Sequence, residues 1–156
     1  MKLSTRGRYG TRVLLDLALH WGEGSILLKD IARRQEISLS YLEHLIAPLI
    51  AAGMIKSVRG ARGGVSLFKD PQEVKLSEVI QVLEGSLAPV ECVSNPEAYQ
   101  RSSFCATRDI WAEVKRAIDE VLESVTLQDL VEGQRQKWRL KQSEDHGEQC
   151  ISRSDA

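Results

Sequence analysis

Residues 26–69 constrain the fold more than any other stretch, because they combine two short helical patterns with a glycine-rich hairpin. Each helical pattern places its apolar residues on one face, and a polar break at 35–36 separates the two. The second pattern starts near Ser38 and ends at Gly53. Two helices joined by a tight break form a helix-turn-helix, and strands at 54–58 and 65–69 would add a wing. The apolar positions of the two helices are Leu28, Ile31, Ala32, Leu42, Leu45 and Leu49.

This arrangement inserts the second helix into a DNA major groove and lays the hairpin tip along the backbone or the minor groove. Short polar side chains on the outer face of that helix would read the base edges. Glu43, for example, can accept a hydrogen bond from a cytosine amino group. Ser40 and Glu43 also have the spacing of a capping box, so the helix starts at Ser38 or at Ser40. The alternative role of this pair is to cap the helix without contacting DNA. The candidate reading residues are Ser38, Ser40, Tyr41, Glu43 and His44.

The hairpin tip carries Arg59 and Arg62 among the glycines Gly60, Gly63 and Gly64. Glycine lets the backbone approach a surface closely, and arginine adds affinity in a narrow minor groove. A solvated turn is the alternative. The charge distribution favours a contact between the hairpin tip and DNA. Residues 1–70 hold 11 Lys/Arg against 6 Asp/Glu, although the whole chain has a net charge of −1.

Residues 107–124 predict a long helix whose apolar positions recur every three or four residues. One small winged domain cannot cover such a stripe, so we expect the same helix of a second subunit to cover it. The chain would then be a homodimer. The interface positions are Ile110, Trp111, Val114, Ile118, Val121 and Leu122.

We therefore predict a mainly α fold with a small β-wing. A winged helix-turn-helix DNA-binding domain would occupy 1–85, with a first helix at 8–20, a short strand at 26–28 and a last helix at 77–83. A cysteine-bearing sensor loop at 86–105, a dimerisation helix with a return helix at 106–134, and a flexible polar tail at 135–156 would follow. No apolar run reaches the roughly 18 residues of a membrane span, and arginines interrupt the start of the chain, so we expect a cytoplasmic protein.

Four separated segments resemble the winged-helix regulators of the IscR/NsrR/CymR (BadM-type) family, and the IscR branch above all. The resemblance covers about residues 1–132. It implies a homodimer on a pseudo-palindromic operator, with Glu43 prominent in base reading and Arg59 inserted into the minor groove. The segments that carry the resemblance are 1–10, 38–43, 58–64 and 105–111.

The same resemblance implies a [2Fe-2S] cluster held by three cysteines in the loop before the long helix. Cys92 and Cys105 occupy the first and third of these positions, whereas the second is Tyr99. A fourth ligand is a histidine in the IscR branch, at the place of Arg108, and an acidic residue in the NsrR branch, at the place of Arg8.

Two thiolates per subunit are fewer than the usual ligand set. Three interpretations follow: a labile cluster completed by Cys150 or by the partner subunit, a thiol switch between Cys92 and Cys105 (or no cofactor at all), or a sequence altered at Tyr99. The predicted function is a DNA-binding regulator gated at Cys92 and Cys105, and the alternative is a protein-interaction module that does not bind DNA. An enzyme is not expected, because the histidines are scattered and no glycine-rich phosphate loop opens a helix.

Overall fold

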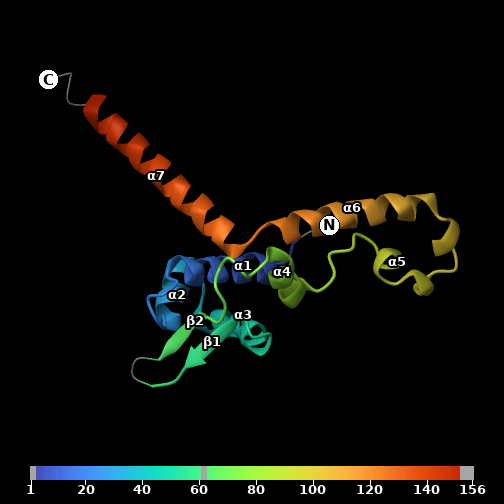
Figure 1. Ribbon diagram of the computed structural model, residues 1–156, viewed down its shortest axis with the longest axis horizontal. Helices are drawn as coiled ribbons and strands as arrows, with labels where there is room; N and C mark the ends of the chain where they lie inside the picture. The colour runs from blue at the N-terminus through green and yellow to red at the C-terminus, as the bar shows by residue number, and fades with distance from the viewer. Residues whose placement is uncertain (1–2, 61–62, 152–156) are drawn as a thin grey trace.

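The helices at the centre of the molecule come from the three segments with the clearest apolar periodicity. In the computed structural model, which describes residues 3–60 and 63–151, these are α1 (Thr5–Leu19), α2 (Leu28–Gln35) and α3 (Leu39–Ala51). They pack against one another behind a small hairpin (Figure 1). The first helix begins earlier than predicted, because the Ser4 side chain caps it by accepting a hydrogen bond from Gly7 N.

A tight turn joins α2 to α3. Glu36 adopts the left-handed conformation with φ 55°, and Ile37 N donates to Ala32 O at 3.0 Å. Ser38 then caps α3, since its Oγ accepts a hydrogen bond from Tyr41 N at 3.2 Å. The alternative start at Ser40 is wrong, because Ser40 already lies inside the helix and its side chain makes no cap.

The wing is an antiparallel pair of β1 (Ile55–Val58) and β2 (Gly64–Leu67), with Ile55 opposite Leu67. The strand predicted at 26–28 is reduced to a single bridge between Ile26 and Val65, because Leu28 already belongs to α2. At Gly64 a Cβ would lie 2.3 Å from the Ile26 backbone oxygen, so this bridge requires glycine there.

One hydrophobic core unites these elements with α4 (Leu76–Glu84) and the first turns of α7 (Leu127–Ile151). At Gly10 of α1 a Cβ would lie only 2.5 Å from a Leu83 methyl group, so the glycine permits the close packing of α1 on α4. The largest fully buried side chains are Leu14, Leu17, Ile31, Leu42, Leu45, Leu49, Ile55, Leu67, Leu83 and Leu127.

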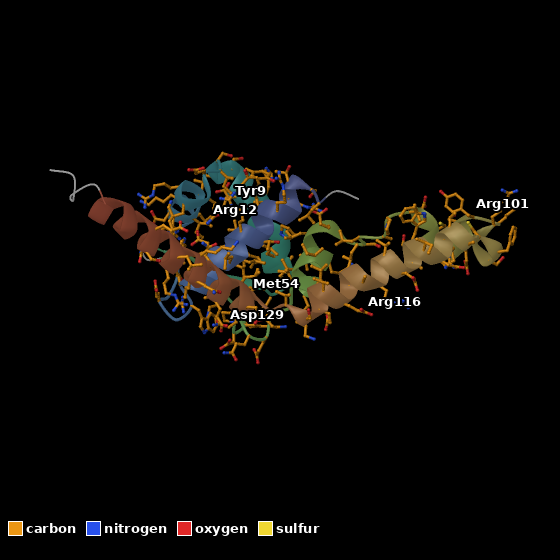
Figure 2. The ribbon with its side chains drawn as sticks, turned by 90° about the horizontal axis from the view of Figure 1, so that it is seen from above. Tyr9, Arg12, Met54, Arg101, Arg116 and Asp129 are labelled. Atoms are coloured by element: carbon orange, nitrogen blue, oxygen red, sulfur yellow. The ribbon has the colours of Figure 1, made fainter. Side chains whose placement is uncertain are left out.

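The helix α6 (Ala106–Ser124) projects from this core, and none of its residues is buried. The preceding segment is not wholly irregular, because it contains α5 (Glu91–Ser94) and two 3-10 turns at Pro96–Ala98 and Ser102–Phe104. Figure 2 shows α6 extending from the core, with Arg116 along its length and Arg101 near its far end.

The prediction of an unstructured tail from residue 135 is wrong as far as Ile151, because α7 continues to that residue. Its glutamine, arginine, lysine and glutamate residues are good helix formers, which explains a helix without apolar periodicity. Leu127 and Val131 anchor its start in the core, whereas Trp138 and Leu140 are exposed. No helix within 3–60 and 63–151 is long and apolar enough to cross a membrane.

Candidate nucleic-acid interface and sensor loop

The outer face of α3 presents polar side chains to solvent. Ser40, Glu43 and His44 are exposed and lie at positions i, i+3 and i+4, so they share one helix face. The opposite face carries the leucines of the core, which fixes the rotation of the helix. Ser38 is exposed but its hydroxyl caps the helix, and Tyr41 is half-buried. The structure thus brings the predicted reading residues together at the start of α3.

Tyr41 is held by an aromatic contact that sequence reasoning missed. Its ring meets the Tyr9 ring edge-on, with centroids 6.1 Å apart. The guanidinium of Arg12 lies 5.1 Å from the centre of the Tyr9 ring, and that of Arg8 lies 6.0 Å away. Both arginines are exposed, so they add positive charge beside the start of α3. From the sequence, both arginines counted toward the basic first half of the chain, and neither was predicted to lie beside the start of α3.

The wing projects from the body on the side opposite α7 (Figure 1). Arg59 is exposed at the end of β1, and Gly60 follows with φ 113°. Gly63 N donates to Gly60 O at 2.8 Å, which closes the described part of the tip. Arg62 lies outside the described residues, so its predicted contact with DNA stays a prediction.

Cys92 and Cys105 are free thiols within the predicted sensor loop, residues 86–105. Cys92 lies on α5, and Cys105 is the residue immediately before α6. Arg108 links the two segments, because its Nε donates to Cys92 O at 2.9 Å. The Cys105 sulfur lies 3.1 Å from Thr107 Oγ1. The Thr107 hydroxyl and the backbone N–H of Arg108 lower the pKa of Cys105, because both stabilise the thiolate.

The residues at the remaining expected ligand positions are engaged otherwise. The Tyr99 hydroxyl donates to Glu91 Oε2 at 3.2 Å, and the negative charge of Glu91 raises the pKa of Tyr99. Arg108 has no lone pair to donate to iron. Within the described residues, no three His, Cys, Asp or Glu side chains are grouped to hold a metal. The donors described in one chain therefore do not fit a complete [2Fe-2S] site; the Cys150 side chain lies outside the described part.

The apolar stripe of α6 is largely exposed in this chain. Ile110 is 57%, Trp111 42% and Val121 62% exposed. The remaining positions of the stripe are the half-buried Val114, Ile118 and Leu122.

A groove of about 450 Å³ runs between α4 and the second half of α6, with Ile80, Leu87 and Leu122 among its lining. The C-terminal end of α6 is tied to the core, since Ser77 Oγ donates to Glu123 Oε2 at 2.6 Å and Lys75 also binds Glu123. The opposite end of the helix carries the sensor loop away from the core.

The three-helix core, the polar face of α3 and the hairpin define a winged helix-turn-helix protein, which confirms the predicted fold class. Residues 3–133 match the Rrf2 family, which is described as an iron-dependent transcriptional regulator. The chain belongs to the Rrf2 family of DNA-binding transcriptional regulators. This membership favours the regulator over the protein-interaction module, and it supports the expectation that the chain is not an enzyme.

Two curated relatives cover most of the chain. The transcriptional regulator CymR of Bacillus subtilis is 43% identical over 130 residues, which are 83% of this chain and 89% of the relative. The protein rrf2 of Nitratidesulfovibrio vulgaris is 46% identical over 131 residues, which are 84% of this chain and 87% of the relative.

Solved structures give the same result. The structure of CymR, the global cysteine regulator of B. subtilis, aligns with a TM-score of 0.73 at 42% identity, covering 85% of this chain and 97% of CymR. The T. potens IscR structure aligns with a TM-score of 0.71 at 45% identity, covering 85% of this chain and 88% of that chain. The family match ends at residue 133, so most of α7 lies beyond it.

Proposed function

We propose that this protein is a homodimeric regulator that reads a pseudo-palindromic operator and whose binding depends on the state of Cys92 and Cys105. The observation that carries the proposal is the exposed polar face of α3 beside the projecting wing. Ser40, Glu43 and His44 make no side-chain hydrogen bond within the described residues, so their polar atoms are free to meet base edges. Arg59 stands on the wing, where it would reach the minor groove.

The dimer follows from the uncovered stripe of α6. A helix of 19 residues without one buried side chain is unusual in a stable monomer, because exposed apolar surface gains free energy when it is buried. The same helix of a second subunit would cover Ile110, Trp111 and Val121. Two-fold symmetry would then present two α3 helices to successive major grooves of one DNA face.

The dependence of DNA binding on the state of the two thiols, called the gate below, is inferred from their position. Arg108 ties the backbone of Cys92 to the first turn of α6, the proposed dimer helix. An oxidant such as diamide would take two electrons and two protons from the two thiols, which then form a disulfide between Cys92 and Cys105. This bond would change the distance between α5 and α6, and therefore the placement of α6 and of the two DNA-binding domains. The iron ligands that the described part of one chain can offer are too few for a complete cluster, which favours a thiol switch over a cluster. A cluster completed by a group of the partner subunit or by Cys150 is the competing form of the same gate.

DNA reading is tested by selecting an operator from a random duplex library with the full-length protein. Arg59→Ala should lower affinity for the selected operator and for random duplex alike, by about tenfold at moderate salt, because it removes a contact common to all sequences. The slope of log affinity against log salt concentration should become shallower by about one. Fluorescence anisotropy measures both quantities.

Arg116→Ala is the matched control, because Arg116 is an exposed arginine on α6, far from α3 and the wing. Its affinity and salt slope should equal those of the wild type. A wild-type protein that selects no sequence, or an Arg59→Ala variant with unchanged affinity and slope, would contradict the proposed interface.

The gate is tested on the same operator with thiol-reduced and diamide-oxidised protein. We expect the two affinities to differ by about tenfold or more, and Cys92→Ser and Cys105→Ser to abolish the difference. Cys150→Ser is the control that should keep it. Equal affinity in every state would remove the gate.

An anaerobic absorption spectrum after iron and sulfide reconstitution separates the two forms of the gate. Charge-transfer bands with about two irons and two sulfides per subunit would show that a cluster, and not a thiol switch, forms the gate. A bare protein spectrum would support the thiol switch.

A further inference from the structure

A buried carboxylate on α1 joins this helix to the last turn of α2. Asp16 is only 3% exposed. Arg34 Nε lies 3.1 Å from each carboxylate oxygen of Asp16, Arg34 Nη2 lies 2.9 Å from Oδ1, and Gln35 Nε2 donates to Oδ2 at 3.0 Å. His20 Nδ1 lies 3.3 Å from Oδ1. A buried carboxylate without partners is costly, so these contacts hold the end of α2 firmly against α1.

The contacts continue from Gln35 to the DNA-facing surface. Arg12 Nε donates to Gln35 Oε1 at 3.0 Å, and the guanidinium of Arg12 lies over the Tyr9 ring. Tyr9 in turn meets Tyr41 edge-on in the first turn of α3. Figure 2 shows Tyr9 and Arg12 near each other on this side of the molecule. An unbroken series of contacts therefore runs from Asp16 to the start of the proposed reading helix.

The same residues border the turn that sets the angle between α2 and α3. Arg34 and Gln35 immediately precede Glu36, whose left-handed conformation is unfavourable for a residue with a side chain. Such a turn persists only where its surroundings hold it. On one side Asp16 holds Gln35, and on the other side Tyr9 contacts Tyr41. These contacts act on the start of α3 in addition to the burial of its leucines in the core.

We propose that Asp16 and Gln35 are positioning residues for operator reading, which hold α3 at the angle that presents Ser40 and Glu43 to the bases. This inference rests on the proposed reading role of α3. Phosphate contacts tolerate small changes of helix angle, whereas hydrogen bonds to base edges do not. Loss of the network therefore lowers discrimination between sequences and spares affinity for random DNA.

Asp16→Asn changes one hydrogen-bond acceptor into a donor at nearly constant shape. Arg34 and Gln35 both donate to this carboxylate, so one donor of the new amide faces another donor. A flip of the Gln35 amide would relieve that conflict but would turn Nε2 toward Arg12 Nε. Either arrangement breaks one step of the network.

The test compares affinity for the duplex that the wild type selects from a random library with affinity for random duplex at the same ionic strength. Asp16→Asn should weaken operator binding by about tenfold and leave random-duplex binding unchanged. Asp30→Asn is the matched control, because it removes the same charge from a more exposed carboxylate on α2, whose ion pair within 3–60 and 63–151 is with Arg33. Its ratio of the two affinities should equal that of the wild type.

Gln35→Ala serves if Asp16→Asn does not fold, because it keeps the pair of Asp16 and Arg34 and removes the two side-chain hydrogen bonds of Gln35, one to Asp16 and one to Arg12. Circular dichroism and thermal unfolding establish that each variant is folded at the assay temperature. An unchanged affinity ratio in the folded variants, or an equal loss for both duplexes, would overturn the inference. A wild type that selects no sequence would instead refute the proposed reading function.

Discussion

At Cys105, two neighbours along the chain set the chemistry of one side chain. The Thr107 hydroxyl and the Arg108 backbone N–H approach the sulfur because Cys105 stands immediately before the first turn of α6, to which both residues belong. Both stabilise the thiolate, so the pKa of Cys105 lies below its ordinary value. The thiolate form therefore persists to lower pH than it would in an ordinary cysteine.

Thr107→Val removes the hydroxyl and should raise the pKa of Cys105 toward its ordinary value. Alkylation by iodoacetamide at neutral pH should slow, because less thiolate is present, and the midpoint of the pH–rate profile should move to higher pH. The measurement uses a Cys92→Ser, Cys150→Ser background, so that only Cys105 reacts. Ser103→Ala, which removes an exposed loop hydroxyl, is the control. A midpoint that does not move would show that Thr107 plays no part.

Among the elements, α6 owes its exposure to its own sequence pattern. Apolar side chains form a stripe on one face, while Glu113, Arg116 and Glu120 form ion pairs on the other. The C-terminal end of the helix is held to the start of α4, where Ser77 donates a hydrogen bond to Glu123. A helix with one apolar and one charged face, attached at one end, is suited to pair with a copy of itself.

Val121→Glu should convert the proposed dimer to a monomer, because burying an unpaired charge in an apolar interface costs several kcal/mol. Sedimentation velocity would show the smaller species, and operator affinity should fall by more than tenfold because the two half-sites are no longer read together. The winged domain should keep its thermal unfolding transition, since Val121 is 62% exposed in the protomer.

Arg116→Glu is the control for this substitution, because it places a negative charge on the opposite face of α6. It should leave the oligomeric state unchanged. A Val121→Glu protein that sediments like the wild type would exclude this face of α6 as the dimer interface.

At the scale of the whole molecule, sequence periodicity predicted the order of the elements well and their ends less well. The polar break at 35–36 predicted the turn between α2 and α3, and the glycines predicted the wing. Ser38 and Ser40 are both of the residue type that caps a helix, and only the folded structure showed that Ser38 is the N-cap of α3. The prediction of a flexible tail failed because a helix built from polar residues has no apolar repeat to detect.

The local pattern of side chains by itself determined the winged helix-turn-helix, the polar face of α3 and the unpaired stripe of α6, because periodicity and turn chemistry act between near neighbours. Only the tertiary structure decided that Asp16 binds Arg34 and Gln35, which are 18 and 19 residues away, and that Arg108 reaches Cys92. Such contacts depend on how separate elements pack, and no periodic pattern records which charged groups meet when they do.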